Sequence, residues 1–183
     1  MPPGPDRLAG TGGRPIRSVV FSEATLARRV EELGREITAA YPDGHLLVIG
    51  LLKGSFIFLA DLVRRIERPL QIDFLVASSY GMARTSSGAV QLRYEPALAL
   101  EGKHILVVDD IIDSGRTMTE LLDWLRRRNP KSLSICALLD KQLAPPPKEL
   151  RFLGFTAPNA FLVGYGLDCA EDFRHLPYIA DLD

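Results

Sequence analysis

The sequence predicts an α/β fold: a mostly parallel twisted sheet with helices on both faces. Short runs of consecutive apolar residues alternate with segments in which apolar residues recur every three or four positions. The first pattern is typical of strands buried on both faces and the second of amphipathic helices, and their alternation favours a parallel sheet. The 183 residues are enough for one domain with a substantial core.

The first regular elements are predicted between residues 22 and 66. A helix over residues 22–41 has apolar residues at steps of four, three and four, begins at Ser22 as its N-cap and ends before Pro42. The uncharged run 46–51 predicts a strand buried on both faces. Apolar residues at 59, 62, 63 and 66 predict a second helix after a turn at Gly54.

The rest of the chain continues this alternation. Segment 80–90 is rich in small and polar residues and predicts a mobile loop that cannot fill a core. Ser114 would cap a helix with an apolar stripe at 118, 121, 122 and 125. Further strands are predicted over residues 70–79, 104–108, 132–139, 151–155 and 161–163.

Charge and composition exclude several classes of protein. With 22 basic and 23 acidic residues there is no overall field that favours nucleic acid, so an anionic ligand must be held by a local site. The longest apolar run, Leu46 to Leu59, is interrupted by Lys53 and is too short to span a membrane. The two cysteines, 33 residues apart, form no Cys-x-x-Cys pair, and a reducing cytoplasm is expected.

The chain is divided into two parts. Residues 1–17 are rich in proline and glycine, contain no apolar stretch that could serve as a signal peptide and are expected to form a disordered tail. Residues 18–183 are expected to form a single domain.

An acidic turn is the most unusual feature of the sequence. Asp109, Asp110 and Asp113 follow an apolar strand, and Ser114, Gly115 and Thr117 stand at the start of the next helix. Backbone N–H groups at a helix start bind phosphate, whereas carboxylates accept hydrogen bonds from sugar hydroxyls or hold Mg²⁺. A phosphorylated sugar would satisfy both halves, although ordinary helix caps and a solvated turn are the simpler alternative.

The stretch Val-Val-Asp-Asp-Ile-Ile-Asp-Ser-Gly-Arg-Thr over residues 107–117 resembles the phosphoribosyl pyrophosphate (PRPP) motif of the type I phosphoribosyltransferases. The resemblance extends from about Ser22 to the C-terminus and is greatest to the hypoxanthine and hypoxanthine-guanine phosphoribosyltransferases. Five further segments occur in the order found in those enzymes: residues 51–55, 78–81, 138–141, 161–168 and 173–178.

The resemblance implies a purine salvage enzyme. Such an enzyme transfers the phosphoribosyl group of PRPP to hypoxanthine or guanine, gives IMP or GMP and pyrophosphate, and requires Mg²⁺. It also implies a small hood formed by the N- and C-terminal segments, and a homodimer or homotetramer. Neither nucleic acid nor a membrane is expected as a partner.

The resemblance assigns the donor side of the site. Asp113 would be the general acid/base at the purine N7, while Asp109 and Asp110 would contact the ribose hydroxyls and the Mg²⁺ shell. Lys53, in a turn that often contains a non-proline cis peptide in this family, and Arg174 would hold the pyrophosphate. The remaining residues assigned to PRPP are Gly54, Ser114, Gly115, Arg116 and Thr117.

For the purine, the resemblance implies that Lys141 donates to the 6-oxo group, Phe161 stacks on the base and the Leu162 backbone reads its edge. Asp168, also assigned to the purine site, would contribute its backbone carbonyl and a carboxylate to a second Mg²⁺. Ser79 and Tyr80 would begin a lid that excludes water.

Each of these residues also has a simpler explanation. Lys53 and Lys141 could be surface lysines, Phe161 could be core, and Arg174 could form a surface pair with Asp172. Their common position at predicted strand ends and turns favours a site.

Two departures from the family bear on the site. Asp109 stands where many relatives have Glu, and Ala160 replaces a charged residue that several relatives carry. Two alternative functions stay open: a regulatory nucleic-acid-binding protein of the same fold, and a xanthine-preferring phosphoribosyltransferase.

Overall fold

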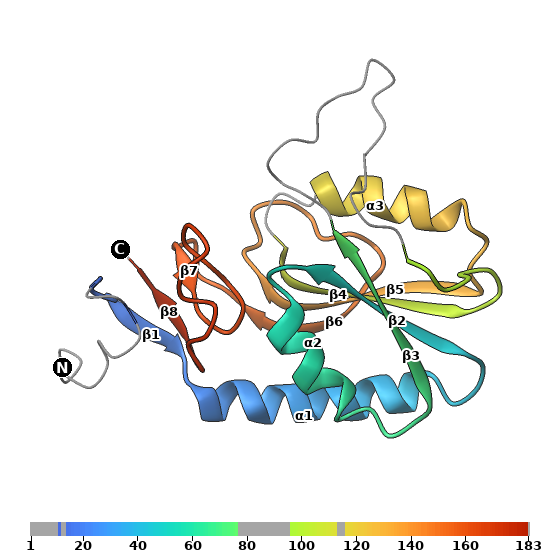
Figure 1. The fold of residues 1–183 in the computed structure, drawn as a ribbon, viewed down its shortest axis with the longest axis horizontal. Helices are drawn as coiled ribbons and strands as arrows, with labels where there is room; N and C mark the ends of the chain where they lie inside the picture. The colour runs from blue at the N-terminus through green and yellow to red at the C-terminus, as the bar shows by residue number, and fades with distance from the viewer. Residues whose placement is uncertain (1–10, 12–13, 77–95, 113–115, 183) are drawn as a thin grey trace, which may run out of the picture.

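The computed structural model describes residues 11, 14–76, 96–112 and 116–182. Its main sheet has five strands in the order β3-β2-β4-β5-β6, and every neighbouring pair is parallel (Figure 1). The strands are β2 (Leu46–Leu52), β3 (Leu70–Val76), β4 (His104–Ile112), β5 (Ser132–Asp140) and β6 (Leu150–Thr156). The predicted parallel sheet is confirmed.

Helices cover both faces of this sheet. Helices α1 (Glu23–Ala40) and α2 (Phe56–Val63) pack on one face and α3 (Arg116–Arg126) on the other (Figure 1). As predicted, Ser22 is the N-cap of α1, where its side-chain oxygen accepts a hydrogen bond of 3.3 Å from the Thr25 N–H.

The core consists of two layers separated by the sheet. Along β2, Leu46 and Val48 belong to the layer under α1 and α2, whereas Leu47 and Ile49 belong to the layer under α3. Successive side chains of a strand point to opposite faces, so a strand that is apolar throughout supplies both layers. This explains the continuous apolar run 46–49 in the sequence.

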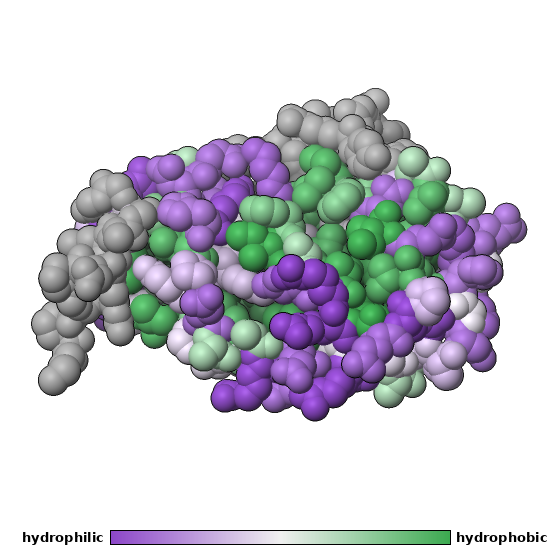
Figure 2. All heavy atoms as spheres, turned by 60° about the horizontal axis from the view of Figure 1, so that its bottom comes forward, coloured by the Kyte–Doolittle hydropathy of each residue, from purple (hydrophilic) through white to green (hydrophobic). Residues whose placement is uncertain are grey.

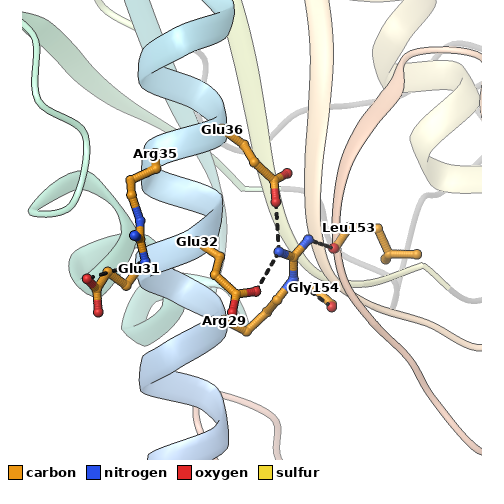
Figure 3. A network of polar contacts seen from close by, with 7 residues as sticks. All are labelled: Arg29, Glu31, Glu32, Arg35, Glu36, Leu153 and Gly154. Atoms are coloured by element: carbon orange, nitrogen blue, oxygen red, sulfur yellow. Dashed lines mark hydrogen bonds and ion pairs between the residues drawn. The ribbon is translucent and has the colours of Figure 1, made fainter.

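A single arginine joins α1 to the edge strand β6. The Arg29 guanidinium donates to the carbonyl oxygens of Leu153 (2.7 Å) and Gly154 (3.1 Å), and to the carboxylates of Glu32 (2.9 Å) and Glu36 (2.7 Å) (Figure 3). These contacts satisfy two backbone acceptors of the edge strand, which would otherwise be open to pairing with another chain.

A second, antiparallel sheet contains β1 (Ser18–Phe21), β8 (Ile179–Asp181) and β7 (Leu162–Val163) in that order. It lies beside the main sheet with both described ends of the chain (Figure 1). We call this sheet, with the connecting residues 164–178, the hood. It corresponds to the hood expected from the terminal segments, although strands at β1 and β8 were not among those predicted.

The hood also corrects the boundary of the predicted tail. Ile16 is buried in the hood core, and the Arg17 N–H donates to the Asp181 carbonyl oxygen at 2.8 Å. Arg14 lies 3.4 Å from the Asp172 carboxylate. Residues 14, 16 and 17 of the predicted tail therefore pack against the hood, while residues 1–10 and 12–13 lie outside the described residues.

The surface on the side of α1 is mostly hydrophilic, with hydrophobic side chains visible between the polar ones (Figure 2). Phe56 on α2 and Ile72 on the edge strand β3 are among the large apolar residues that stay exposed. None of the helices in the described ranges is long and apolar enough to cross a membrane.

Candidate functional site

The predicted site residues of the main sheet lie at its carboxyl edge. Lys53 follows β2 directly, and Asp109 and Asp110 lie near the end of the neighbouring strand β4. Lys141 follows β5, and its backbone N–H donates to the Ile112 carbonyl oxygen at 3.1 Å. Parallel pairing of these three strands brings residues far apart in sequence to one edge.

The structure corrects one detail of this prediction. The strand predicted over residues 104–108 continues to Ile112, so Asp109 and Asp110 belong to β4 rather than to a turn after it. Asp109 is paired with Ala137 of β5 in the sheet register. Backbone pairing therefore fixes the acidic residues more firmly than a turn would.

Asp109 and Asp110 form a partly buried acidic pair. The Asp110 N–H donates to the Asp109 carboxylate at 3.0 Å. Burial raises the pKa of Asp109 well above its ordinary value, and the neighbouring Asp110 charge raises it further; burial also raises the pKa of Asp110. A cation beside this pair would relieve both effects.

A turn after β2 packs directly on the acidic pair. The Leu52–Lys53 peptide bond is cis, as the resemblance implies. A Cβ on Gly54 would collide with the Asp110 carboxylate, and a Cβ on Gly166 of the hood would collide with the Gly54 carbonyl oxygen. Two glycines therefore allow the β2 turn, the end of β4 and the hood to meet in close contact.

The hood adds two acids and an arginine to this edge. The Arg174 guanidinium lies 2.9 Å from the Asp168 carboxylate and 3.1 Å from the Glu171 carboxylate, and donates to the Gly166 carbonyl oxygen at 2.7 Å. The second Glu171 oxygen lies 3.0 Å from Lys53 Nζ. Lys53 and Arg174 are therefore joined through one carboxylate, and the Arg174–Asp172 surface pair considered from the sequence does not form.

Glu171 was missed by the sequence analysis. Its spacing of three from both Asp168 and Arg174 was visible, but such spacing brings side chains together reliably only on a helix. Here the backbone has positive φ at Ala170 (53°) and Glu171 (71°), which these residue types do not predict.

The hood residues assigned to the purine differ in exposure. The Phe161 side chain is 47% exposed, so it is not a core residue. Leu162 is buried in β7, which pairs with β8. The Phe161 carbonyl oxygen accepts a hydrogen bond from the Leu182 N–H at 3.0 Å. The backbone of Phe161 is therefore fixed while its ring stays accessible.

Several predicted site residues cannot be placed. Asp113, Ser114 and Gly115 lie outside the described residues, as do Ser79, Tyr80 and the whole predicted lid. Arg116 and Thr117 form the start of α3, but their side chains are not described.

The donor set at this edge fits a hard divalent cation. Two adjacent carboxylates with raised pKa values provide oxygen ligands, which Mg²⁺ prefers, and Mg²⁺ commonly takes only one or two protein carboxylates besides substrate oxygens. Within the described ranges, no cluster of three or more His, Cys, Asp or Glu side chains forms a metal site of its own.

Comparison with known proteins places this edge in a family. The model of the phosphoribosyl transferase domain matches residues 20–169. The hypoxanthine phosphoribosyltransferase of Buchnera aphidicola is 47% identical over 167 residues, which cover 88% of this chain and 93% of that protein. The hypoxanthine-guanine phosphoribosyltransferase of Dictyostelium discoideum is 42% identical over 171 residues, 91% of this chain and 95% of that protein.

Solved structures agree with these sequences. A hypoxanthine-guanine phosphoribosyltransferase from Bacillus anthracis superposes with a TM-score of 0.81 at 41% identity and covers 91% of this chain and 98% of its own. A hypoxanthine phosphoribosyltransferase from Staphylococcus aureus has a TM-score of 0.84 at 37% identity, with 92% of each chain covered. The parallel sheet, the acidic pair at its carboxyl edge and these similarities together show that the chain belongs to the phosphoribosyl transferase family.

Proposed function

We propose that the protein is a 6-oxopurine phosphoribosyltransferase of purine salvage. It transfers the phosphoribosyl group of PRPP to hypoxanthine, guanine or both, and gives IMP or GMP and pyrophosphate. The observation that carries this proposal is the partly buried Asp109–Asp110 pair at the carboxyl edge of the sheet, where Asp110 lies against Gly54. The similarity to hypoxanthine and hypoxanthine-guanine phosphoribosyltransferases over about nine-tenths of the chain supports the same activity.

On the donor side, Asp109 and Asp110 accept hydrogen bonds from the ribose hydroxyls and would hold Mg²⁺. A bound Mg²⁺ would neutralise negative charge on the leaving pyrophosphate. The raised pKa values of the acidic pair support this assignment, because two partly buried carboxylates are best stabilised by a cation or by hydroxyl donors. Asp168, whose carboxylate lies 2.9 Å from the Arg174 guanidinium, would hold a second Mg²⁺.

Lys53 and Arg174 bind the pyrophosphate as it leaves. Both are cations beside the acidic pair, and they already share one carboxylate, so they can be bridged by a ligand with two charged groups. The helix start formed by Ser114, Gly115, Arg116 and Thr117 holds the 5′-phosphate. Positive charge develops on the ribose in the transition state, and fixed carboxylates next to it stabilise that charge.

On the purine side, Asp113 handles the N7 proton as general acid/base. Lys141 donates to the 6-oxo group, and the Leu162 backbone reads the edge of the base. Phe161 stacks on the purine, which its partly exposed ring supports.

The proposal extends to the organisation of the enzyme. Residues 18–183 form one catalytic domain, and the segment beginning at Ser79 and Tyr80 closes over the reacting ribose to exclude water. The enzyme is a homodimer or homotetramer, as the resemblance to the family implies. The free thiols of Cys136 and Cys169 are in keeping with the reducing cytoplasm.

An assay of nucleotide formation tests this function. Hypoxanthine, guanine, xanthine and adenine are each incubated with the protein and PRPP, with Mg²⁺ and with excess chelator. We expect IMP or GMP only when Mg²⁺ is present, and little product from adenine. Preference for xanthine would show a xanthine-preferring phosphoribosyltransferase. Nucleic-acid binding without turnover of any base would favour the regulatory nucleic-acid-binding protein.

A further inference from the structure

The Glu171 carboxylate forms ion pairs with both cations that are assigned to the pyrophosphate. The two oxygens of Glu171 are divided between them: one lies 3.0 Å from Lys53 Nζ and the other 3.1 Å from the Arg174 guanidinium. A bidentate anion bridging two cations is the arrangement that a diphosphate would make. Glu171 therefore holds the same partners that the leaving group needs.

The backbone around Glu171 directs its side chain to this place. Cys169 and Asp172 exchange backbone hydrogen bonds of 3.2 and 3.1 Å, which close a tight turn. The Glu171 N–H donates to the Asp168 carboxylate at 2.9 Å, and positive φ angles at Ala170 and Glu171 orient the turn. Non-glycine residues seldom adopt such φ values, so the position of the carboxylate is built into the fold of the hood.

We propose that Glu171 acts as a built-in competitor of pyrophosphate. In the unliganded enzyme its carboxylate neutralises Lys53 and Arg174, and a diphosphate binds only after this side chain turns away. This inference rests on the proposed function, because it takes Lys53 and Arg174 as the pyrophosphate ligands.

The competition acts on every ligand that needs these two cations. PRPP carries the same diphosphate as the product, so both ligands must displace Glu171 and both lose the same part of their affinity. PRPP is also held by its ribose and its 5′-phosphate, whereas free pyrophosphate has only these cations and the metal as its partners. The carboxylate therefore lowers the affinity of the ligand with fewer other contacts and promotes release of the product pyrophosphate.

The charge of Glu171 is tested by Glu171→Gln, which keeps the shape of the side chain. Binding of inorganic pyrophosphate in the presence of Mg²⁺ is measured by calorimetry and by product inhibition. We expect the dissociation constant of pyrophosphate to fall roughly two- to fivefold, the scale of an exposed ion pair. The Kd should fall by a similar factor for PRPP, which carries the same diphosphate, and the KM for hypoxanthine at saturating PRPP should stay unchanged.

A matched control lies next to this residue. Asp172→Asn removes one negative charge from the same turn, but Asp172 pairs with Arg14 at 3.4 Å rather than with Lys53 or Arg174. Its pyrophosphate affinity should equal that of the wild-type protein. Because both residues are exposed, thermal melting is expected to confirm that both variants are folded.

Each result of these measurements is decisive. Unchanged or weaker binding of pyrophosphate to Glu171→Gln would overturn the inference, and weaker binding would mean that the carboxylate helps to orient the two cations. An equal gain in Asp172→Asn would also overturn it, since the effect would then be one of general charge. In either case, nucleotide formation by the wild-type protein would leave the proposed function intact. If the wild-type protein neither made nucleotide nor bound pyrophosphate, both the proposed function and the inference on Glu171 would be overturned.

Discussion

The Asp110 carboxylate lies so close to the α-carbon of Gly54 that any side chain at position 54 would collide with it. The two residues come from neighbouring strands: Gly54 follows β2 by two residues, and Asp110 lies in β4. Their contact joins the turn that carries Lys53 to the acidic pair. The geometry of the candidate site therefore depends on an absent side chain as much as on the charged ones.

Gly54→Ala is predicted to impair the site much more than the fold. The atoms in collision are at the end of the Asp110 side chain, which can rotate away, so the free energy of unfolding should fall by less than about 1 kcal/mol. The displaced carboxylate no longer meets the ribose, and kcat/KM for PRPP should fall by roughly 100-fold. Urea unfolding and steady-state kinetics measure the two effects.

Gly50→Ala is the matched control. Its Cβ would collide with a methyl group of Leu59 in the core, so overpacking should cost roughly 1–3 kcal/mol of stability. The kcat/KM of the folded protein should stay unchanged, because Gly50 faces α2 rather than the acidic pair. Equal effects of the two alanines on kinetics would show that the Gly54–Asp110 contact has no special role.

Asp109→Asn is predicted to stabilise the unliganded protein while it lowers activity. At neutral pH a partly buried carboxylate with a raised pKa destabilises the folded state, and Asn removes this charge but keeps an acceptor for the Asp110 N–H. The gain should be on the order of 1 kcal/mol, or roughly 2–4 °C in Tm at this chain length. Calorimetry at pH 7.5 without PRPP or Mg²⁺ measures it.

An exposed acid provides the comparison for that variant. Asp123→Asn removes a carboxylate that pairs with Arg126 on α3, and Tm should stay the same or fall slightly. A Tm of Asp109→Asn below that of the wild-type protein would mean that the acidic pair contributes stability instead of costing it.

Asp113→Asn tests the proton transfer. If this carboxylate handles the N7 proton, turnover should fall by roughly 10²- to 10⁴-fold, while PRPP binding is largely retained. Single-turnover assays and PRPP titrations separate the two. An unchanged rate would remove Asp113 from this role.

The stability of the protein should decrease as the pH falls below about 6.5, in part because of His104. Burial lowers the pKa of this histidine in the folded state, and the Lys131 charge lowers it further. As the pH falls, His104 therefore takes up a proton in the unfolded chain before it does so in the folded chain. The stability that neutral His104 contributes is complete above its ordinary pKa and is lost as the pH falls from there toward its pKa in the folded state. Urea unfolding at pH 7.5 and 5.5 measures the difference.

His104→Asn isolates this contribution from the other titrating groups. Asn keeps a polar atom near the position of Nδ1, which lies 2.6 Å from the Ser132 hydroxyl, but does not titrate. The variant should lose less stability between the two pH values than the wild-type protein. An identical loss would show that His104 does not contribute.

Much of the fold could be predicted from the sequence because its signals are local. The apolar run 46–49 and the helical stripe in 23–40 reflect burial of single elements, and both are confirmed. Strands β1 and β8 could not be predicted in the same way, since each has only a few residues and forms by pairing with the other across the length of the chain.

In the candidate site, too, the residues in local motifs could be predicted, whereas the contacts between distant residues could not. The motif at residues 107–117 and the order of the other segments led to the correct family, and Lys53, Asp109, Asp110 and Lys141 do lie at one edge. Glu171 could not be found, because its position depends on the hood turn and on distant Lys53. Likewise, the Gly54–Asp110 contact follows from pairing between β2 and β4, and no local sequence pattern predicts it.

A crystal structure of the protein with PRPP and Mg²⁺ is the most direct test of the carboxyl edge as the donor site. We expect the ribose hydroxyls on Asp109 and Asp110, and the diphosphate between Lys53 and Arg174. PRPP bound at another surface, with this edge left empty, would contradict the proposed function at its foundation.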